Sequence, residues 1–122
     1  MMSPSRSASA LGERLERLTG EDAACCLTEY RGLGEGMRRS AEFAAALRRV
    51  RALADEHRLL ALALLRRRGE LCACEIQAAT GLSHATVSHH MGLLEHAGLV
   101  RARRQGKWMY YRLSSDSEKL VP

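Results

Sequence analysis

Four cysteines carry the candidate chemistry of this sequence, because thiolates are preferred ligands of soft metal ions. Cys72 and Cys74 are one residue apart in the segment 70-ELCACEI-76, and Cys25 and Cys26 are adjacent. Residues two apart on an ideal helix lie about 200° apart around its axis, so Cys72 and Cys74 can share an ion only at a frayed first turn. We therefore expect Cys25 and Cys26 to supply the missing ligands.

The proposed ligands indicate which ions the site would hold. A set of thiolates with no histidine beside it favours As(III), Sb(III), Cd(II), Pb(II) or Hg(II) over Mg(II) and Ca(II). Since As(III) takes three sulfurs in a pyramid, we expect Cys25, Cys26 and Cys72 to bind it, with Cys74 accessory. A cadmium-type ion would use all four cysteines.

Other readings of the cysteines stay open. Cys74 alone could be a small buried apolar residue. Two cysteines that link on oxidation or on exposure to polysulfide would make the protein a thiol-redox sensor instead. An enzyme needs a nucleophile with a positioned base and a substrate pocket, and we find neither pattern, so we predict no enzymatic activity.

Length and charge narrow the class of protein. The chain has 122 residues, which is enough for one hydrophobic core. Its formal net charge of +5 indicates a polyanionic partner. The basic excess is concentrated between Ser83 and Arg112. The longest apolar run, residues 59–65, is too short to span a membrane, and the N-terminus has no secretory apolar region. We expect a cytoplasmic protein with no membrane partner, whose cysteines are thiols or metal ligands rather than disulfides.

The segments that must position the cysteines differ in character. Residues 3–10 are rich in serine and alanine and are expected to be disordered, and residues 11–18 have the apolar spacing of a short amphipathic helix. Residues 19–39 contain four glycines and are expected to form a mobile arm. We therefore divide the chain into a flexible N-terminal arm (1–39) that carries Cys25 and Cys26, a folded domain (40–113) and a short tail (114–122).

Residues 40–113 predict a mainly α fold of the α+β type. Ser40, Asp55 and Ser83 are placed to begin helices over 40–54, 56–68 and 84–97, and a shorter helix is expected from about Cys72 to Thr80. Apolar and basic residues alternate over the first four positions of the segment 99–104, and the segment 107–113 is rich in aromatic residues. Gln105-Gly106 lies between them as a tight turn, so the two segments predict a β-hairpin. This order predicts a winged helix-turn-helix with a C-terminal β-hairpin wing.

The second helix of the predicted motif has small and polar residues off its apolar face, which can enter a major groove about 12 Å wide. The hairpin tip carries basic residues that would meet phosphates. The alternative to DNA binding is that the helix is simply exposed to solvent and the basic hairpin is solvated. His57, His90 and His96 are read as structural. The predicted DNA-binding residues are Ser83, His84, Thr86, Ser88, His89, Arg103, Arg104 and Lys107. One such helix covers only half a site, so we expect a homodimer on double-stranded operator DNA of inverted symmetry.

The runs 52-ALADEHRLLALALL-65, 70-ELCACEI-76, 81-GLSHATVSHHMGLLEHAGLV-100 and 106-GKWMYYRL-113 resemble the ArsR/SmtB family of metal-sensing repressors. The resemblance covers about residues 40–113. It implies a homodimeric repressor that binds its operator when metal-free and releases it when As(III) or Sb(III), or alternatively Cd(II) or Pb(II), binds cysteine thiolates. It also implies that arm cysteines join the Cys-x-Cys motif.

The sequence departs from the family in two places. Gln77 stands where related arsenic sensors often carry a third cysteine. The family usually has a further C-terminal helix for dimerisation, whereas residues 114–122 form only a short tail without histidine, whose ending resembles the start of a protease-cleavage tag. We therefore expect no second zinc site in the tail and a larger share of the dimer contact at the N-terminal helix.

Overall fold

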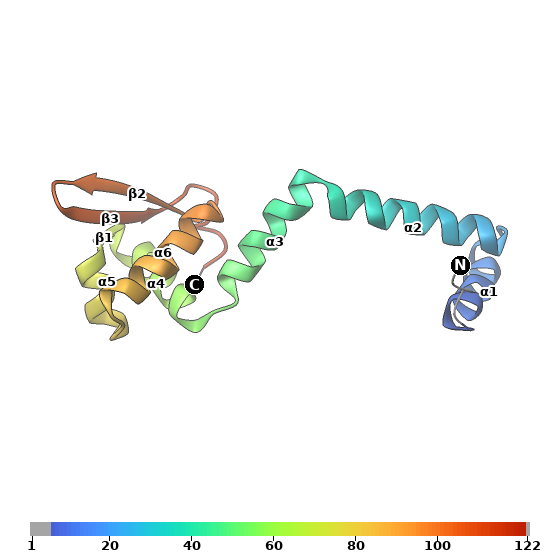
Figure 1. The fold of residues 1–122 in the computed structure, drawn as a ribbon, viewed down its shortest axis with the longest axis horizontal. Helices are drawn as coiled ribbons and strands as arrows, with labels where there is room; N and C mark the ends of the chain where they lie inside the picture. The colour runs from blue at the N-terminus through green and yellow to red at the C-terminus, as the bar shows by residue number, and fades with distance from the viewer. Residues whose placement is uncertain (1–5, 122) are drawn as a thin grey trace. The chain divides into compact units, whose positions relative to one another are not determined.

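The computed structural model describes residues 6–121 and divides the chain into two compact units, Met1–Ala44 and Ala45–Pro122. The elements, labelled in Figure 1, are α1 (Arg6–Thr19), α2 (Ala23–Arg39), α3 (Ala41–Leu53), α4 (Glu56–Arg68), β1 (Glu70–Cys72), α5 (Ala73–Thr80), α6 (His84–His96), β2 (Val100–Gln105) and β3 (Trp108–Leu113). None of the described helices is long and apolar enough to cross a membrane.

The first unit contains two helices, and α2 occupies most of residues 19–39, which we expected to form a mobile arm. The predicted amphipathic helix is present but begins at Arg6, inside the stretch expected to be disordered, while residues 3–5 lie outside the described part of the chain. The glycine-rich stretch forms α2, whose first turn is capped by Asp22. A Cβ atom at Gly12 would lie 2.9 Å from Cδ1 of Leu27, so this glycine allows α1 and α2 to pack closely.

The second unit contains the predicted helix-turn-helix, and its caps are those that the sequence predicts. The Asp55 carboxylate accepts a hydrogen bond from the backbone N–H of Arg58 at 3.0 Å, and the Ser83 hydroxyl accepts one from the N–H of Thr86 at 3.2 Å. Gly81 ends α5 with a φ of 75°, a conformation that glycine adopts without the usual steric cost. The helix order and the turn between α5 and α6 are therefore confirmed.

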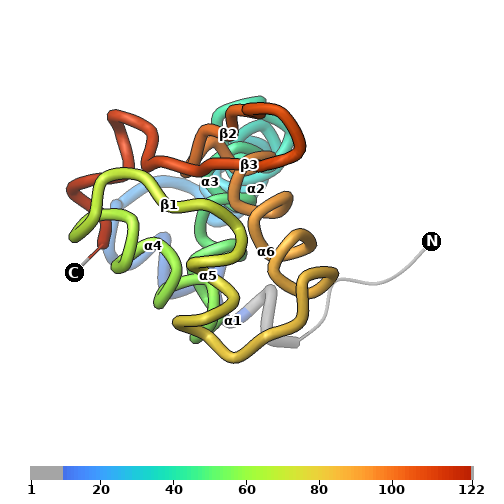
Figure 2. Tube along the Cα trace, turned by 90° about the vertical axis from the view of Figure 1, so that its left-hand side faces the viewer, coloured from blue at the N-terminus to red at the C-terminus, as the bar shows by residue number. Residues whose placement is uncertain are grey.

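The wing is the hairpin of β2 and β3, and it belongs to a three-stranded antiparallel sheet in the order β1-β3-β2, one strand more than we predicted. The hairpin of β2 and β3 is confirmed, and β1 adds to the free edge of β3. Cys72 is therefore the last residue of a strand, and α5 begins at Ala73. Figures 1 and 2 show the sheet along one side of helices α4, α5 and α6.

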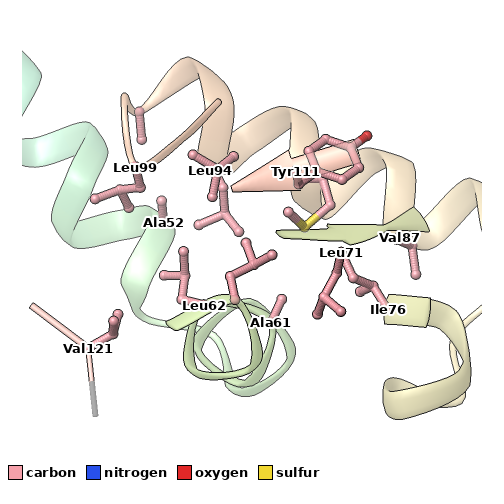
Figure 3. Close-up of a cluster of buried hydrophobic side chains, with 14 of the residues drawn as sticks. Ala52, Ala61, Leu62, Leu71, Ile76, Val87, Leu94, Leu99, Tyr111 and Val121 are labelled. Atoms are coloured by element: carbon pink, nitrogen blue, oxygen red, sulfur yellow. The ribbon is translucent and has the colours of Figure 1, made fainter. Parts of the chain in front are cut away.

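The core of the second unit lies between these helices and the inner face of the sheet. Leu62 of α4 and Leu94 of α6 are fully buried and point toward each other in Figure 3, beside Tyr111 of β3. The apolar face of α6, formed by Val87, Met91 and Leu94, is buried in this core. Because apolar residues of α4, α6 and β3 meet here, the core fixes α6 against the sheet.

The tail packs against this core, so the packed unit extends beyond the boundary that we predicted at residue 113. The buried Ser117 hydroxyl donates to the carbonyl oxygen of Leu99 at 2.7 Å, and the backbone N–H of Ser114 donates to the same oxygen at 3.0 Å. Val121 is 4% exposed, and its carbonyl accepts a hydrogen bond from Arg66. These contacts hold the tail on α4 and on the start of the hairpin.

Candidate soft-ion site and nucleic-acid interface

Cys72 lies at the junction of β1 and α5, where it is the N-cap residue of the helix. Its backbone N–H donates a hydrogen bond to Oε1 of Glu75 at 3.0 Å. This bond, followed by a hydrogen bond from the Cys72 thiol, holds the pKa of Glu75 below its ordinary value. The thiol is half-exposed and lies where regular helical geometry does not yet constrain it, as a shared site with Cys74 would require.

The register of the sheet aligns Cys72 with the wing. Cys72 pairs with Tyr110 of β3, and Tyr110 pairs with Arg103 of β2. Directly opposed residues in antiparallel strands project their side chains on the same face, so these three residues form a row across the sheet. The next row, Leu71, Tyr111 and Ala102, faces the core, since Leu71 and Tyr111 are buried. Cys72 therefore lies on the outer face of the sheet.

A second contact on this outer face joins β1 to the wing. Nε of Arg103 donates to Oε2 of Glu70 at 3.0 Å, and the guanidinium carbon lies 4.6 Å from the centre of the Tyr110 ring. The hydrogen bond from Arg103 lowers the pKa of Glu70, and the same bond raises the pKa of Arg103. We predicted Arg103 as a phosphate contact, but it is held by a carboxylate two residues before Cys72.

Cys74 points to a different part of the unit. It is exposed and lines a cavity of about 290 Å³ between the start of α6 and the wing. Four predicted DNA-binding residues line the same cavity: His84, Ser88, Arg104 and Lys107. Trp108, the single tryptophan of the chain, also lines it. The structure thus brings together predicted DNA contacts from α6 and from the wing, and places Cys74 beside them.

The remaining residues predicted to read DNA lie on or near the exposed side of α6. Ser83 and His89 are exposed, whereas Thr86 is half-buried, and its hydroxyl accepts a hydrogen bond from the Ser83 hydroxyl at 2.9 Å. Ser83 and Thr86 therefore also serve the N-terminal cap of the helix. His84, Ser88 and His89 are the exposed side chains of the first two turns that carry donors or acceptors for base edges or phosphates.

Cys25 and Cys26 belong to the first turn of α2 in the other unit, and their surroundings differ sharply. Cys25 is exposed, and its backbone N–H donates to the Asp22 cap. Cys26 is fully buried, with its sulfur 3.4 Å from the Thr19 hydroxyl and 3.7 Å from a Glu21 carboxylate oxygen. Cys26 is buried although we expected residues 19–39 to form a mobile arm, because α1 covers the first turn of α2.

Sequence reasoning missed a cluster at the start of α4. Asp55 and His57 lie beside His90 of α6, with one potential ligand atom from each within 4.8 Å of the others. His90 is not free, because Nη1 of Arg58 lies 3.0 Å from its Nδ1. Burial is the main cause that lowers the pKa of His90. The spacing Asp55-x-His57 was visible in the sequence, but the partner on α6 was not.

The fold and the site together define a winged helix-turn-helix protein of the regulatory kind. Residues 55–102 match the model of the bacterial regulatory protein arsR family. The chain is similar to the homodimeric winged helix-turn-helix DNA-binding domain Mb0332 of Mycobacterium bovis, described as a possible ArsR-family regulator, with a TM-score of 0.63 and 38% identity over 68% of this chain and 77% of that one. The chain belongs to the ArsR family.

Two curated relatives are named for metal or metalloid resistance. The arsenical resistance operon repressor of Escherichia coli is 48% identical over 62 residues, which are 51% of this chain and 53% of that protein. A homolog of the cadmium resistance regulatory protein CadC from Staphylococcus aureus is 38% identical over 69 residues, or 57% of each chain. The match therefore spans about half the length of these relatives.

The burial of the four thiols predicts an order of chemical reactivity. In the reduced protein, iodoacetamide should alkylate Cys25 and Cys74 first, because both are exposed, and Cys26 last, because it is fully buried. Mass spectrometry of peptides from a time course measures each rate. Equal rates for the adjacent pair Cys25 and Cys26 would contradict the packing of α1 on α2.

Proposed function

We propose that the protein is a transcriptional repressor that binds operator DNA as a homodimer and releases it when As(III) or Sb(III) binds cysteine thiolates. The observation that carries the proposal is the position of Cys72 on the outer face of the sheet, in the same row as Tyr110 and Arg103. The name of the Escherichia coli relative, which is 48% identical over the matched region, supports an arsenic-type inducer.

The DNA contact would be made by one face of the second unit. The exposed start of α6 would enter the major groove, and the wing would meet the flanking backbone. His84 and Ser88 line one cavity with Arg104 and Lys107, so a duplex that contacts the helix would also reach these two cations. The homodimeric state that the Mycobacterium bovis domain is described as having supports binding to two half-sites.

The ion would bind three thiolates from two units of the fold. Cys72 would contribute from the edge of the sheet and Cys25 from the exposed start of α2, within one chain or across the dimer. Cys26 would have to leave its buried position to bind, so ion binding would alter the packing of α1 on α2. Cys74 would be accessory for As(III), since it points into the cavity beside α6.

Induction would act on the wing through the outer face of the sheet. An ion held by Cys72 lies in the same row as Tyr110, over which Arg103 is stacked, and two residues from Glu70, which binds Arg103. Movement of Cys72 toward the other ligands would therefore strain the pairing of β1 with β3 and shift the wing. The ion site and the DNA surface are coupled only if the ion binds one position of the wing more tightly than the other.

A cadmium- or lead-type inducer is the second candidate, and the number of thiols favours it. Cd(II) commonly accepts four sulfur ligands, and the chain has four cysteines, all free among the described residues. The CadC-like relative, 38% identical over 69 residues, also supports this candidate. The two candidates differ in their need for Cys74.

The basic residues of the wing give a prediction for DNA binding. Arg104→Ala or Lys107→Ala should weaken binding to all sequences and reduce the slope of log affinity against log salt by about 1 each. Arg103→Ala is the matched control, and its slope should change less, because Glu70 already neutralises this cation. Fluorescence anisotropy with operator and random duplexes at several salt concentrations measures this. If Arg103→Ala changes the slope as much as Arg104→Ala does, Glu70 does not keep Arg103 from contacting phosphate.

Cysteine variants test the ligand set. Cys72→Ser or Cys25→Ser should abolish release of the operator by As(III) and leave metal-free operator binding unchanged, because neither thiol lines the predicted DNA surface. Cys74→Ser should keep most of the response to As(III) but lose affinity for Cd(II). If the double variant Cys25→Ser,Cys26→Ser responds to As(III) like the parent protein, α2 does not contribute to the site and the three-thiolate proposal is wrong.

A further inference from the structure

The cluster of Asp55, His57 and His90 uses ligand chemistry unlike that of the cysteines. All three residues are half-buried, and their ligand atoms lie within 4.8 Å of one another. Among the described residues it is the only group of three or more histidine, cysteine or acidic side chains that is this close. We propose that these three residues form a second cation site, for a divalent ion of the Zn(II) type.

The donor set suits such an ion. Two imidazoles and one carboxylate, with water in the remaining position, is a set that Zn(II) adopts in proteins, and imidazole also suits Ni(II) and Cu(II). One carboxylate oxygen of Asp55 caps α4, and the other is left to bind the ion. Nitrogen and oxygen ligands distinguish this site from the cysteines, which select softer ions.

The cluster must contract to hold the ion. Bonds of 2.0–2.1 Å in a tetrahedron place ligand atoms about 3.3 Å apart. The ligand atoms, which lie within 4.8 Å of one another, must therefore approach by up to about 1.5 Å. His57 and His90 have ring centres 6.0 Å apart at an interplanar angle of 29°, and rotation of the two rings is the movement that would bring their nitrogen atoms together.

Arg58 is the competitor for this site. Its Nη1 is 3.0 Å from Nδ1 of His90, its Nε donates to the carbonyl oxygen of Ala52 at 2.8 Å, and its Nη2 donates to that of Arg51 at 3.4 Å. An ion on His90 must replace the Nη1 contact, and the two carbonyls would retain the guanidinium nearby. The positive charge weakens the site, so we expect an affinity well below that of structural zinc sites.

Occupation of the site would act on α6. Asp55 and His57 lie at the start of α4, whereas His90 lies in the middle of α6, next to the exposed His89. An ion that joins them would fix the orientation of α6 on α4. The inference does not depend on the cysteines or on the proposed inducer, so its failure would leave the soft-ion proposal untouched.

The test measures Zn(II) binding where no thiol competes. In the full chain with all four cysteines replaced by serine, with folding checked by circular dichroism, competition with a chromogenic chelator should give one Zn(II) per protomer. His57→Gln in this background should weaken binding by about tenfold or more, and Asp55→Asn, which keeps a helix cap, should do the same. His96→Gln, at the exposed end of α6, is the control and should change nothing.

A second measurement on the unaltered reduced protein covers the case in which the cysteine-free variant does not fold. In imidazole NMR spectra, Zn(II) should shift the ring signals of His57 and His90 and leave those of His96 in place. No binding without cysteines, equal affinity of His57→Gln and His96→Gln, or zinc that leaves the His57 and His90 signals unchanged would each overturn the proposal.

Discussion

The pairing of β1 with β3 is the constraint that sets the positions of Cys72 and Glu70 against the wing. It is only three residues long, yet it takes Cys72 out of the helix that follows and sets it opposite Tyr110. It also brings Glu70 within hydrogen-bonding distance of Arg103 on the far strand of the hairpin. Without this strand, Cys72 would not be paired with Tyr110, and only Cys74 would connect the Cys-x-Cys motif to the wing.

The same pairing separates two tasks on the two faces of the sheet. Leu71 and Tyr111 face inward and join the core that holds α6 in place, so the predicted DNA-reading helix has a rigid support. Cys72, Tyr110 and Arg103 form the row on the outer face, where a bound ion can act on the wing without disturbing the core. A repressor needs both, because the DNA surface must be well formed in one state and displaced in the other.

Local signals in the sequence predicted the parts of the fold that local chemistry decides. The caps at Asp55 and Ser83 and the glycine at position 81 are such signals, and the helices they bound are present. β1 was missed because it exists only through pairing with a strand about forty residues away. α2 was missed because its glycines, each costing about 1 kcal/mol in a helix, hid the helical spacing of Tyr30, Leu33 and Met37. The Glu70–Arg103 contact and the approach of His90 to Asp55 and His57 join distant segments, so neither could be predicted from local patterns in the sequence.

We propose that soft-ion binding by thiolates, rather than thiol oxidation, releases the DNA. The most direct measurement is fluorescence anisotropy of labelled operator bound to the fully reduced protein, titrated without oxygen with As(III), Sb(III), Cd(II), Pb(II) or Zn(II). We expect release by As(III) and Sb(III) at about one ion per protomer, with a parallel change in the fluorescence of Trp108 in the wing. Operator that stays bound with every ion, but is released by an oxidant or a polysulfide without metal, would contradict it.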